Sequence, residues 1–315
     1  MKDRSVALLA CNTYGRTTLK EIIDALLKGL FYSIPYGAKI FLKPNLVTGV
    51  RRDGLACTNA EFVACVAEWF VDHGAVVSVA DSPAFGRCSQ VMNACGMTSA
   101  LKGLPVARLD LVKKTRVVLK CGVPVALSTD ILECDQLINL PKIKAHCQML
   151  VSLAVKNLFG AVLGCQKALA HMRYGPSDNL FAALLVDLVS ILPEGVTIVD
   201  GIVAMHKEGP VNGEAFHLGI AAAGRNPVAL DTAILKILGI DACLSPLWFE
   251  CQRRGMTGTD IETISFPLMR PASFHVQDFT VPSVLDPIRF QVGRFIHNGL
   301  RKLFNLNTFE KSPFS

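Results

Sequence analysis

The stretch Leu140-Pro-Lys-Ile-Lys-Ala-His-Cys147 places two lysines and a histidine directly after a run of apolar residues. It continues through Val155-Lys-Asn-Leu-Phe-Gly160 to Gln166-Lys-Ala-Leu-Ala-His171. Residues 140–171 thus hold four lysines, two histidines and one asparagine, mostly among apolar neighbours. Lysine is rarely buried without a partner. A lysine cluster in an apolar segment therefore predicts a cavity that holds a small anionic ligand.

Length and composition indicate a globular protein without a transmembrane segment. The chain has 315 residues, of which 51% are hydrophobic and only 18% are charged. No uncharged apolar run reaches the roughly eighteen residues that a membrane-spanning helix needs. The apolar run at residues 6–10 is too short for a signal peptide. We expect a cytoplasmic protein with a sheet buried on both faces, and an oligomer interface would also account for the apolar composition.

Charge and cysteine spacing exclude two classes of function. The net charge of +6 is mild, and aromatic residues make up only 7%, which argues against a nucleic-acid partner. The chain has eleven cysteines but no Cys-x-x-Cys pair, so it contains no intrinsic ferredoxin-type cluster motif. Most of the cysteines are expected to be buried thiols, and Cys147 and Cys165 remain candidate ligands.

The first half of the chain alternates apolar runs of strand length with amphipathic helical patterns. This alternation predicts an α/β fold: a mostly parallel sheet with helices on both faces. Ligands bind beyond the carboxyl ends of the strands in such sheets. The predicted strands are 5–11, 38–42, 75–80, 135–140, 196–199 and 215–223, with short antiparallel strands within 104–130. The predicted helices are 17–29, 59–73, 147–159, 165–172, 181–192 and 226–238.

The chain divides into a main α/β domain, residues 1–282, and a basic amphipathic tail, residues 283–315. Lobes at 1–145 and 146–282 are one arrangement for the main domain. Within the tail, residues 289–304 carry apolar side chains on one side and basic ones on the other. Such a helix docks on the body or on a second subunit, or lies on an anionic membrane.

Several polar side chains follow predicted strands and are expected to line one crevice. Lys43 and Asn45 follow the second strand, and Asp81 and Ser82 follow the third. Asp200 ends the strand at 196–199, where a carboxylate suits metal binding or proton transfer.

The lysines and histidines of the central stretch have two interpretations each. Five lysines suit a phosphate, a carboxylate or a nucleotide-like cofactor, and the alternative is that some of them extend to solvent: Lys43, Lys142, Lys144, Lys156 and Lys167. His146 and His171 suit acid–base or metal-binding roles, and the alternative is that they are hydrogen-bonded core residues.

Asparagine, glycine and aspartate positions complete the predicted site. Asn157 and Gly160 belong to the central stretch, and Gly209 and Gly213 shape a loop that lets backbone N–H groups approach a ligand. Asp231 is expected to cap or orient a helix.

An ordered set of short motifs runs along the chain: Lys43-Pro-Asn-Leu-Val47, Thr58, Asp81-Ser-Pro83, Leu140-Pro-Lys-Ile-Lys-x-His146, Lys156-Asn-Leu-Phe-Gly160, Lys167-x-x-x-His171, Asp200-Gly201, Gly209-Pro-x-x-Gly213 and Pro227-Val-Ala-Leu-Asp231. This set resembles the domain-of-unknown-function family 362. The match covers about residues 35–240, and it implies no established activity. Many members of that family carry a C-terminal ferredoxin-like module with four-cysteine clusters, which this sequence lacks after Pro282. A redox role would therefore need a separate electron-transfer protein.

The order of His146, Lys156 and His171 is similar to the histidine–lysine–histidine order of the lactate racemase family. Members of that family hold a nickel-pincer nucleotide through a lysine and a histidine. The resemblance implies that Lys156 links the cofactor, His171 binds nickel and His146 acts as an acid or base.

The leading hypothesis is an enzyme that binds an anionic small molecule or nucleotide-like cofactor. It would use a metal ion, and its chemistry would be redox or proton transfer at a carbon beside a carboxylate or carbonyl. The catalytic candidates are His146, Lys156, His171 and Asp200, of which His171 and Asp200 are also the candidate metal ligands. The alternatives are a nickel-pincer-like racemase of a hydroxy acid and a non-catalytic carrier of a cofactor or an iron–sulfur cluster.

Overall fold

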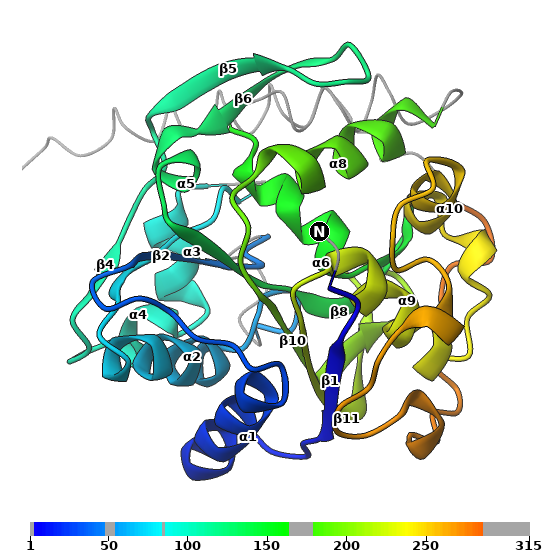
Figure 1. Cartoon of the computed structure of the whole chain (residues 1–315), viewed down its shortest axis with the longest axis horizontal. Helices are drawn as coiled ribbons and strands as arrows, with labels where there is room; N and C mark the ends of the chain where they lie inside the picture. Colours follow the sequence, from blue (N-terminus) through cyan, green and yellow to red (C-terminus); the bar gives the residue numbers. More distant parts are fainter. Residues whose placement is uncertain (1–2, 48–53, 84–85, 164–178, 286–315) are drawn as a thin grey trace, which may run out of the picture.

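A single large β-sheet organises the part of the chain that the structure describes. The computed structural model describes residues 3–47, 54–83, 86–163 and 179–285 (Figure 1). The strands of this sheet are β1 (Val6–Ala10), β2 (Lys39–Pro44), β3 (Val76–Val79), β4 (Val106–Arg108), β7 (Gln136–Leu140), β8 (Lys142–His146), β9 (Leu150–Ser152), β10 (Thr197–His206) and β11 (Glu214–Gly224).

Most neighbouring strands of the sheet are parallel, as the sequence predicted. Their order is β1-β11-β10-β7-β2-β3-β4, with β8 paired to β10 and β9 paired to β8. β10 runs parallel to β7 and β8, and β2 runs parallel to β7 and β3. The antiparallel pairs are β1 with β11, β10 with β11, and β8 with β9.

A separate antiparallel hairpin lies within residues 104–130. It consists of β5 (Lys114–Val118) and β6 (Pro124–Ser128), and a short helix, α5 (Thr129–Leu132), follows it. The short antiparallel strands predicted for this segment are therefore present as β5 and β6. β4 also lies within this segment, but it pairs in parallel with β3 in the main sheet.

Helices pack on both faces of the sheet (Figure 1). In β1, Val6 and Leu8 contribute to one apolar cluster together with Ile234 of α9 (Pro227–Ile237). Ala7 lies between them and contributes to the other cluster, together with Leu19 of the first helix. The alternation along β1 confirms that the sheet is buried on both faces. The helices are α1 (Arg16–Gly29), α2 (Ala60–Asp72), α3 (Cys88–Ala94), α4 (Met97–Ala100), α6 (Ala154–Asn157), α8 (Leu180–Ile191), α9 (Pro227–Ile237) and α10 (Pro246–Arg253).

Asparagine side chains fix where two of these helices begin. Oδ1 of Asn59 accepts hydrogen bonds from the N–H groups of Glu61 and Phe62 at the start of α2. Asn226 caps α9 in the same way, and Pro227 occupies the first turn, where its missing N–H costs nothing.

The predicted helix at 147–159 is wrong. Residues 150–152 form β9, which pairs with β8, and the helical segment is only α6 followed by a 3-10 turn at Leu158–Ala161. Leu150 has a φ of 66°, which a continuous helix does not allow. Pairing with a strand formed earlier in the chain thus overrides the local helical pattern.

Two further predictions differ from the structure. Residues 142–146, for which the sequence pattern predicted neither a helix nor a strand, form strand β8 after β7. The strand predicted at 196–199 continues to His206, so that residues 207–213 form a hairpin loop between β10 and β11.

Other predictions about organisation are not tested. The sheet contains strands from both predicted lobes, 1–145 and 146–282, and the boundary between them stays a prediction. The helices predicted at 165–172 and 289–304 lie outside the described residues.

Candidate functional site

The site lies where two parallel strands separate. β2 and β7 stay paired as far as Pro44 and Leu140. Beyond Pro141 the chain continues as β8 along β10, where Lys142 is in register with Asp200. We call the region where the end of β2 and strand β8 diverge the fork.

Thr58 spans the fork. Its Oγ1 atom donates a hydrogen bond to the carbonyl oxygen of Leu140 at 2.7 Å and accepts one from the N–H of Asn45 at 2.8 Å. The Thr58 side chain is buried, so these bonds replace the backbone pairing that ends at Pro44.

The two-residue period of a strand determines which β8 side chains enter the fork. Lys142, Lys144 and His146 share one face of β8, and each is at most 3% exposed. Ile143 lies on the opposite face and packs in the apolar cluster beneath the sheet. The pattern Lys-x-Lys-x-His therefore brings two lysines and a histidine to the same side of one strand.

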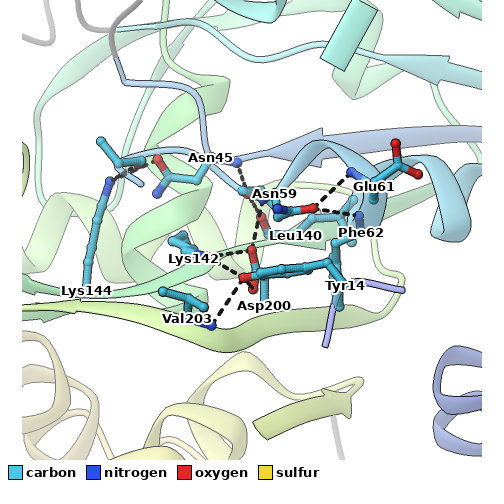
Figure 2. A network of polar contacts seen from close by, with 12 residues as sticks. Tyr14, Asn45, Asn59, Glu61, Phe62, Leu140, Lys142, Lys144, Asp200 and Val203 are labelled. Atoms are coloured by element: carbon cyan, nitrogen blue, oxygen red, sulfur yellow. Dashed lines mark hydrogen bonds and ion pairs between the residues drawn. The ribbon is translucent and has the colours of Figure 1, made fainter. Parts of the chain in front are cut away.

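The first lysine belongs to a closed polar network with Tyr14 and Asp200 (Figure 2). Nζ of Lys142 donates hydrogen bonds to Oδ2 of Asp200 and to the hydroxyl of Tyr14, both at 2.8 Å. The Tyr14 hydroxyl in turn donates to Oδ1 of Asp200 at 2.7 Å and accepts from the N–H of Val203 at 3.2 Å.

Burial and the charge of Asp200 raise the pKa of Tyr14 well above its ordinary value. Tyr14 therefore keeps its proton as a hydrogen-bond donor at neutral pH. Oδ2 of Asp200 also accepts from the N–H of Asn59 at 2.9 Å. Asp200 thus connects β10 to the start of α2.

A second ion pair joins Lys43 and Asp81 at the ends of β2 and β3. Nζ of Lys43 lies 2.9 Å from Oδ1 of Asp81, whose Oδ2 accepts the N–H of Leu46 at 2.8 Å. Burial lowers the pKa of Lys43, and the neighbouring carboxylate opposes this effect. The expectation that these two strand ends meet therefore agrees with the structure.

Gly160 lies against this pair. A Cβ atom added to Gly160 would be 1.9 Å from Oδ1 of Asp81 and 2.2 Å from Nζ of Lys43. Only a residue without a side chain allows the backbone and the ion pair to approach so closely.

Lys144 differs from both other lysines in its partners. Its Nζ atom donates hydrogen bonds to Oδ1 of Asn45 and to the carbonyl oxygen of Ala56, both at 3.0 Å (Figure 2). Both acceptors are neutral, and in the described part of the chain no carboxylate forms an ion pair with Lys144. Burial lowers the pKa of Lys144 to about 8. This amine therefore changes protonation near physiological pH.

Asn157 and Lys156 lie on the short helix α6 behind the fork. Nδ2 of Asn157 donates to Oδ1 of Asn139 at 2.8 Å and to the carbonyl oxygen of Lys43 at 3.4 Å. Nζ of Lys156 lies 4.8 Å from the ring centre of Phe159 and 5.5 Å from that of Phe181. The faces of these two aromatic rings attract the ammonium group of Lys156.

Asp231 anchors the start of α6. Its oxygens accept the N–H groups of Ala154 and Val155 at 2.7 and 3.2 Å. Burial raises the pKa of Asp231 to about 7, although the two hydrogen bonds act in the opposite direction. These contacts agree with the structural role expected for this residue.

The remaining predicted site residues have different surroundings. Nδ1 of His146 accepts hydrogen bonds from the N–H groups of Gln148 and Met149 at 3.1 and 3.3 Å. A Cβ on Gly209 would lie 1.6 Å from the carbonyl oxygen of Ala145, and one on Gly213 would lie 2.3 Å from that of His206. These glycines therefore let the hairpin loop pack closely against neighbouring backbone. Ser82 is half-buried beside Asp81.

Some predictions about ligands lie beyond the described residues. Lys167 and His171 belong to the segment 164–178, which is not described. Among the residues that are described, no group of three or more histidine, cysteine, aspartate or glutamate side chains could hold a metal ion.

Within the described ranges, no helix is long and apolar enough to cross a membrane. The cytoplasmic location stays a prediction.

Sequence reasoning missed several residues of the site. Tyr14 follows β1, which runs in the same direction as β10, so the strand-end rule could have identified it. Asn59 acts through its backbone N–H, for which the sequence contains no signal. The missed residues are Tyr14, Asn59 and Asn139.

Comparisons with known proteins match nearly the whole chain. The model of a family described as a domain of unknown function, DUF362, matches residues 40–236. A thylakoid-associated protein of Synechocystis sp. is 32% identical over 306 residues, which cover 96% of this chain and 95% of that protein.

Two solved structures resemble the chain more distantly. The lactate racemase apoprotein of Thermoanaerobacterium thermosaccharolyticum aligns with a TM-score of 0.46 and 12% identity, over 75% of this chain and 57% of that one. A protein of Thermotoga maritima aligns with a TM-score of 0.41 and 10% identity, over 64% and 53% of the two chains. The match thus spans little more than half the length of either structure.

Proposed function

This chain belongs to the DUF362 family, and we propose that it is an enzyme that binds a small anionic molecule in the fork. The observation that carries the proposal is the excess of buried positive charge. Within the described ranges, three buried lysines, Lys43, Lys142 and Lys144, form ion pairs with only two carboxylates, Asp81 and Asp200.

The unpaired lysine makes an anion a favourable ligand. Burying an ammonium group without a counter-ion costs several kilocalories per mole or lowers its pKa, as it does for Lys144. A small anion that reaches Lys144 would supply the missing negative charge, so its binding would relieve this cost.

The arrangement also supports proton transfer as the reaction. Lys144 can gain or lose a proton near neutral pH, as a general base or acid must. His146 is the next side chain on the same face of β8 and supplies a second group of suitable chemistry. Lys142, Tyr14 and Asp200 would hold the floor of the site in place, since each is already fully engaged with the others.

The nickel-pincer alternative assigns the central role to Lys156. Its ammonium group would have to leave the aromatic faces of Phe159 and Phe181 to reach a cofactor. The proposed nickel ligand His171 lies outside the described residues. If this alternative holds, Lys156→Ala abolishes turnover while Lys144→Met leaves it intact. If the protein is instead a non-catalytic carrier, Lys156→Ala causes the loss of bound cofactor.

A thermal-shift screen tests the proposal. Phosphate, lactate, pyruvate and acetate are added to the wild type, to Lys144→Met and to Lys114→Met, whose lysine is exposed on β5. We expect at least one anion to raise the melting temperature of the wild type and of Lys114→Met but not that of Lys144→Met. Equal shifts in all three proteins would contradict a role for the fork.

The relative from Synechocystis supports a second candidate, association with a membrane surface. Phe31 and Tyr36 lie between α1 and β2 and are 91% and 92% exposed. Aromatic side chains partition favourably into the interfacial region of a bilayer. Flotation with anionic vesicles tests this: the wild type should float, and the double variant Phe31→Ser/Tyr36→Ser should not. Equal flotation of both proteins would exclude this loop as the contact.

A further inference from the structure

The hydrogen bonds of Lys144 match those of a neutral amine. An ammonium group has three N–H donors, whereas a neutral amine has two N–H donors and a lone pair. Nζ of Lys144 has two acceptors, Oδ1 of Asn45 and the carbonyl oxygen of Ala56, at equal distances of 3.0 Å. Two acceptors satisfy both N–H groups of the neutral amine and leave its lone pair available.

The surroundings of Lys144 stabilise the neutral amine more than water does, and they lower its pKa to about 8. Burial has the largest effect. The electrostatic effects of Cys57 and Asp81 oppose it, and the smaller effects of Lys142 and Lys43 act in the same direction as burial. About half of the Lys144 side chains would therefore be neutral at pH 8.

A neutral lysine in a desolvated site is a nucleophile toward carbonyl carbon. Lys43 and Lys142 are each paired with a carboxylate, so the positive charge that a bound anion would balance is that of protonated Lys144 or of its protonated imine. A ligand that satisfies both conditions carries a carbonyl group and a carboxylate close together.

We propose that Lys144 forms an imine with the carbonyl carbon of a small oxo acid whose carboxylate balances the charge of the protonated imine. This inference rests on the proposed binding of anions and names their class. Lys144 is then a catalytic residue, and Asn45 and the Ala56 carbonyl are positioning groups that orient its lone pair.

The reaction balances without any further reagent. The lone pair of Nζ forms a bond to the carbonyl carbon, and the carbonyl oxygen takes the electron pair and then a proton from nitrogen. The resulting carbinolamine loses its hydroxyl group as water, which leaves a carbon–nitrogen double bond. Protonated, this imine withdraws electrons from the adjacent carbon, which makes a proton on that carbon easier to remove.

Borohydride trapping tests the proposal on the full chain. The protein is incubated with glyoxylate or pyruvate at pH 8 and then reduced, because borohydride delivers hydride to the imine carbon and leaves a stable secondary amine. Intact-mass measurement and peptide mapping then locate the added mass. We expect one adduct per chain, on Lys144, in the wild type and in Lys114→Arg, and none at that position in Lys144→Arg. Mapping of the wild type alone remains decisive if the Lys144 variant does not fold.

A parallel titration with lactate and pyruvate distinguishes anion binding from imine formation. If lactate and pyruvate bind to the fork but pyruvate leaves no adduct on Lys144 after reduction, the imine is excluded while anion binding stands. If adducts spread over exposed lysines to the same extent as Lys144, the special reactivity of Lys144 is excluded. If no anion binds and no adduct forms, the proposed function fails together with this inference.

Discussion

The Nζ atom of Lys43 and the Oδ1 atom of Asp81 lie 2.9 Å apart in a pair that is almost completely buried. Among the described residues, this Oδ1 is a buried side-chain oxygen without a well-directed hydrogen bond, so the ion pair is its principal contact. The pair joins the ends of β2 and β3 and touches the backbone at Gly160. It therefore fixes one wall of the fork.

Gly160→Ala should disrupt that wall. The new Cβ would occupy the space of Oδ1 of Asp81, and neither strand end can move far within the sheet. We expect a loss of about 1–3 kcal/mol in the free energy of unfolding, measured by urea denaturation. Gly29→Ala is the control, because it meets only the side chain of Leu268, which is 38% exposed and can move. Equal stability of both variants would show that the pair is not constrained by Gly160.

Replacing one residue of the Lys43–Asp81 pair should lower the free energy of unfolding more than the pair itself contributes to it. Lys43→Met or Asp81→Asn alone leaves a buried charge without its partner, which we expect to cost about 3–5 kcal/mol. The double variant should lose less than the sum of the single variants, as a double-mutant cycle by chemical denaturation would show. The exposed pair Lys207–Glu214 is the control, and Lys207→Met should cost less than about 1 kcal/mol. Additive effects at Lys43 and Asp81 would contradict direct coupling.

Tyr14→Phe should weaken the network around Asp200. The hydroxyl of Tyr14 contacts Lys142, Asp200 and the N–H of Val203, which all lose a partner when it is removed. We expect a loss of about 1–3 kcal/mol in thermal or urea unfolding. Tyr36→Phe removes the same atom from a side chain that is 92% exposed and should have no measurable effect. Equal stability of the two variants would show that the Tyr14 hydroxyl does not stabilise the folded protein.

Asp231 should make stability depend on pH in a specific range. Its pKa is raised from 3.8 to about 7 by burial, so the folded state binds the proton more tightly than the unfolded state. Its contribution to stability is therefore complete below pH 4 and is lost as the pH rises through 7. Asp231→Asn should flatten the decline between these values. It should also lower stability by about 1–3 kcal/mol at neutral pH, because the amide group cannot accept both backbone N–H groups. An unchanged pH profile in that variant would contradict the assignment.

The strand-end rule accounts for what could be predicted of the site. Lys43 and Asp81 each follow a strand of a parallel sheet, and parallel strands end at the same edge, so their meeting follows from the sequence pattern. The alternation in Lys142-Ile-Lys-Ala-His146 also contains the strand signal. The apolar residues that follow, rich in leucine and valine, suit a helix equally well and led to the wrong element at 147–159.

Other features depend on contacts between residues far apart in the chain. The sequence near Lys144 does not indicate that its hydrogen-bond acceptors are Asn45 and Ala56. These contacts arise because β2 and β7 stop pairing at Pro44 and Leu140. The sequence motif identified Gly160 as a site residue. Its packing against Lys43 and Asp81 is seen only in the structure. The roles predicted for His146, Lys156, Lys167 and His171 stay predictions.

The central claim is that an anion entering the fork supplies the counter-charge that Lys144 lacks. The most direct measurement is calorimetric titration with lactate, which has no carbonyl carbon to react, in two buffers of different ionisation enthalpy. Because the pKa of Lys144 is about 8 and an anion would raise it, binding at pH 8 should take up about half a proton per ligand. Uptake should vanish at pH 6 and in Lys144→Met. Lactate that binds without proton uptake at pH 8, or that binds Lys144→Met as tightly as the wild type, would contradict the account.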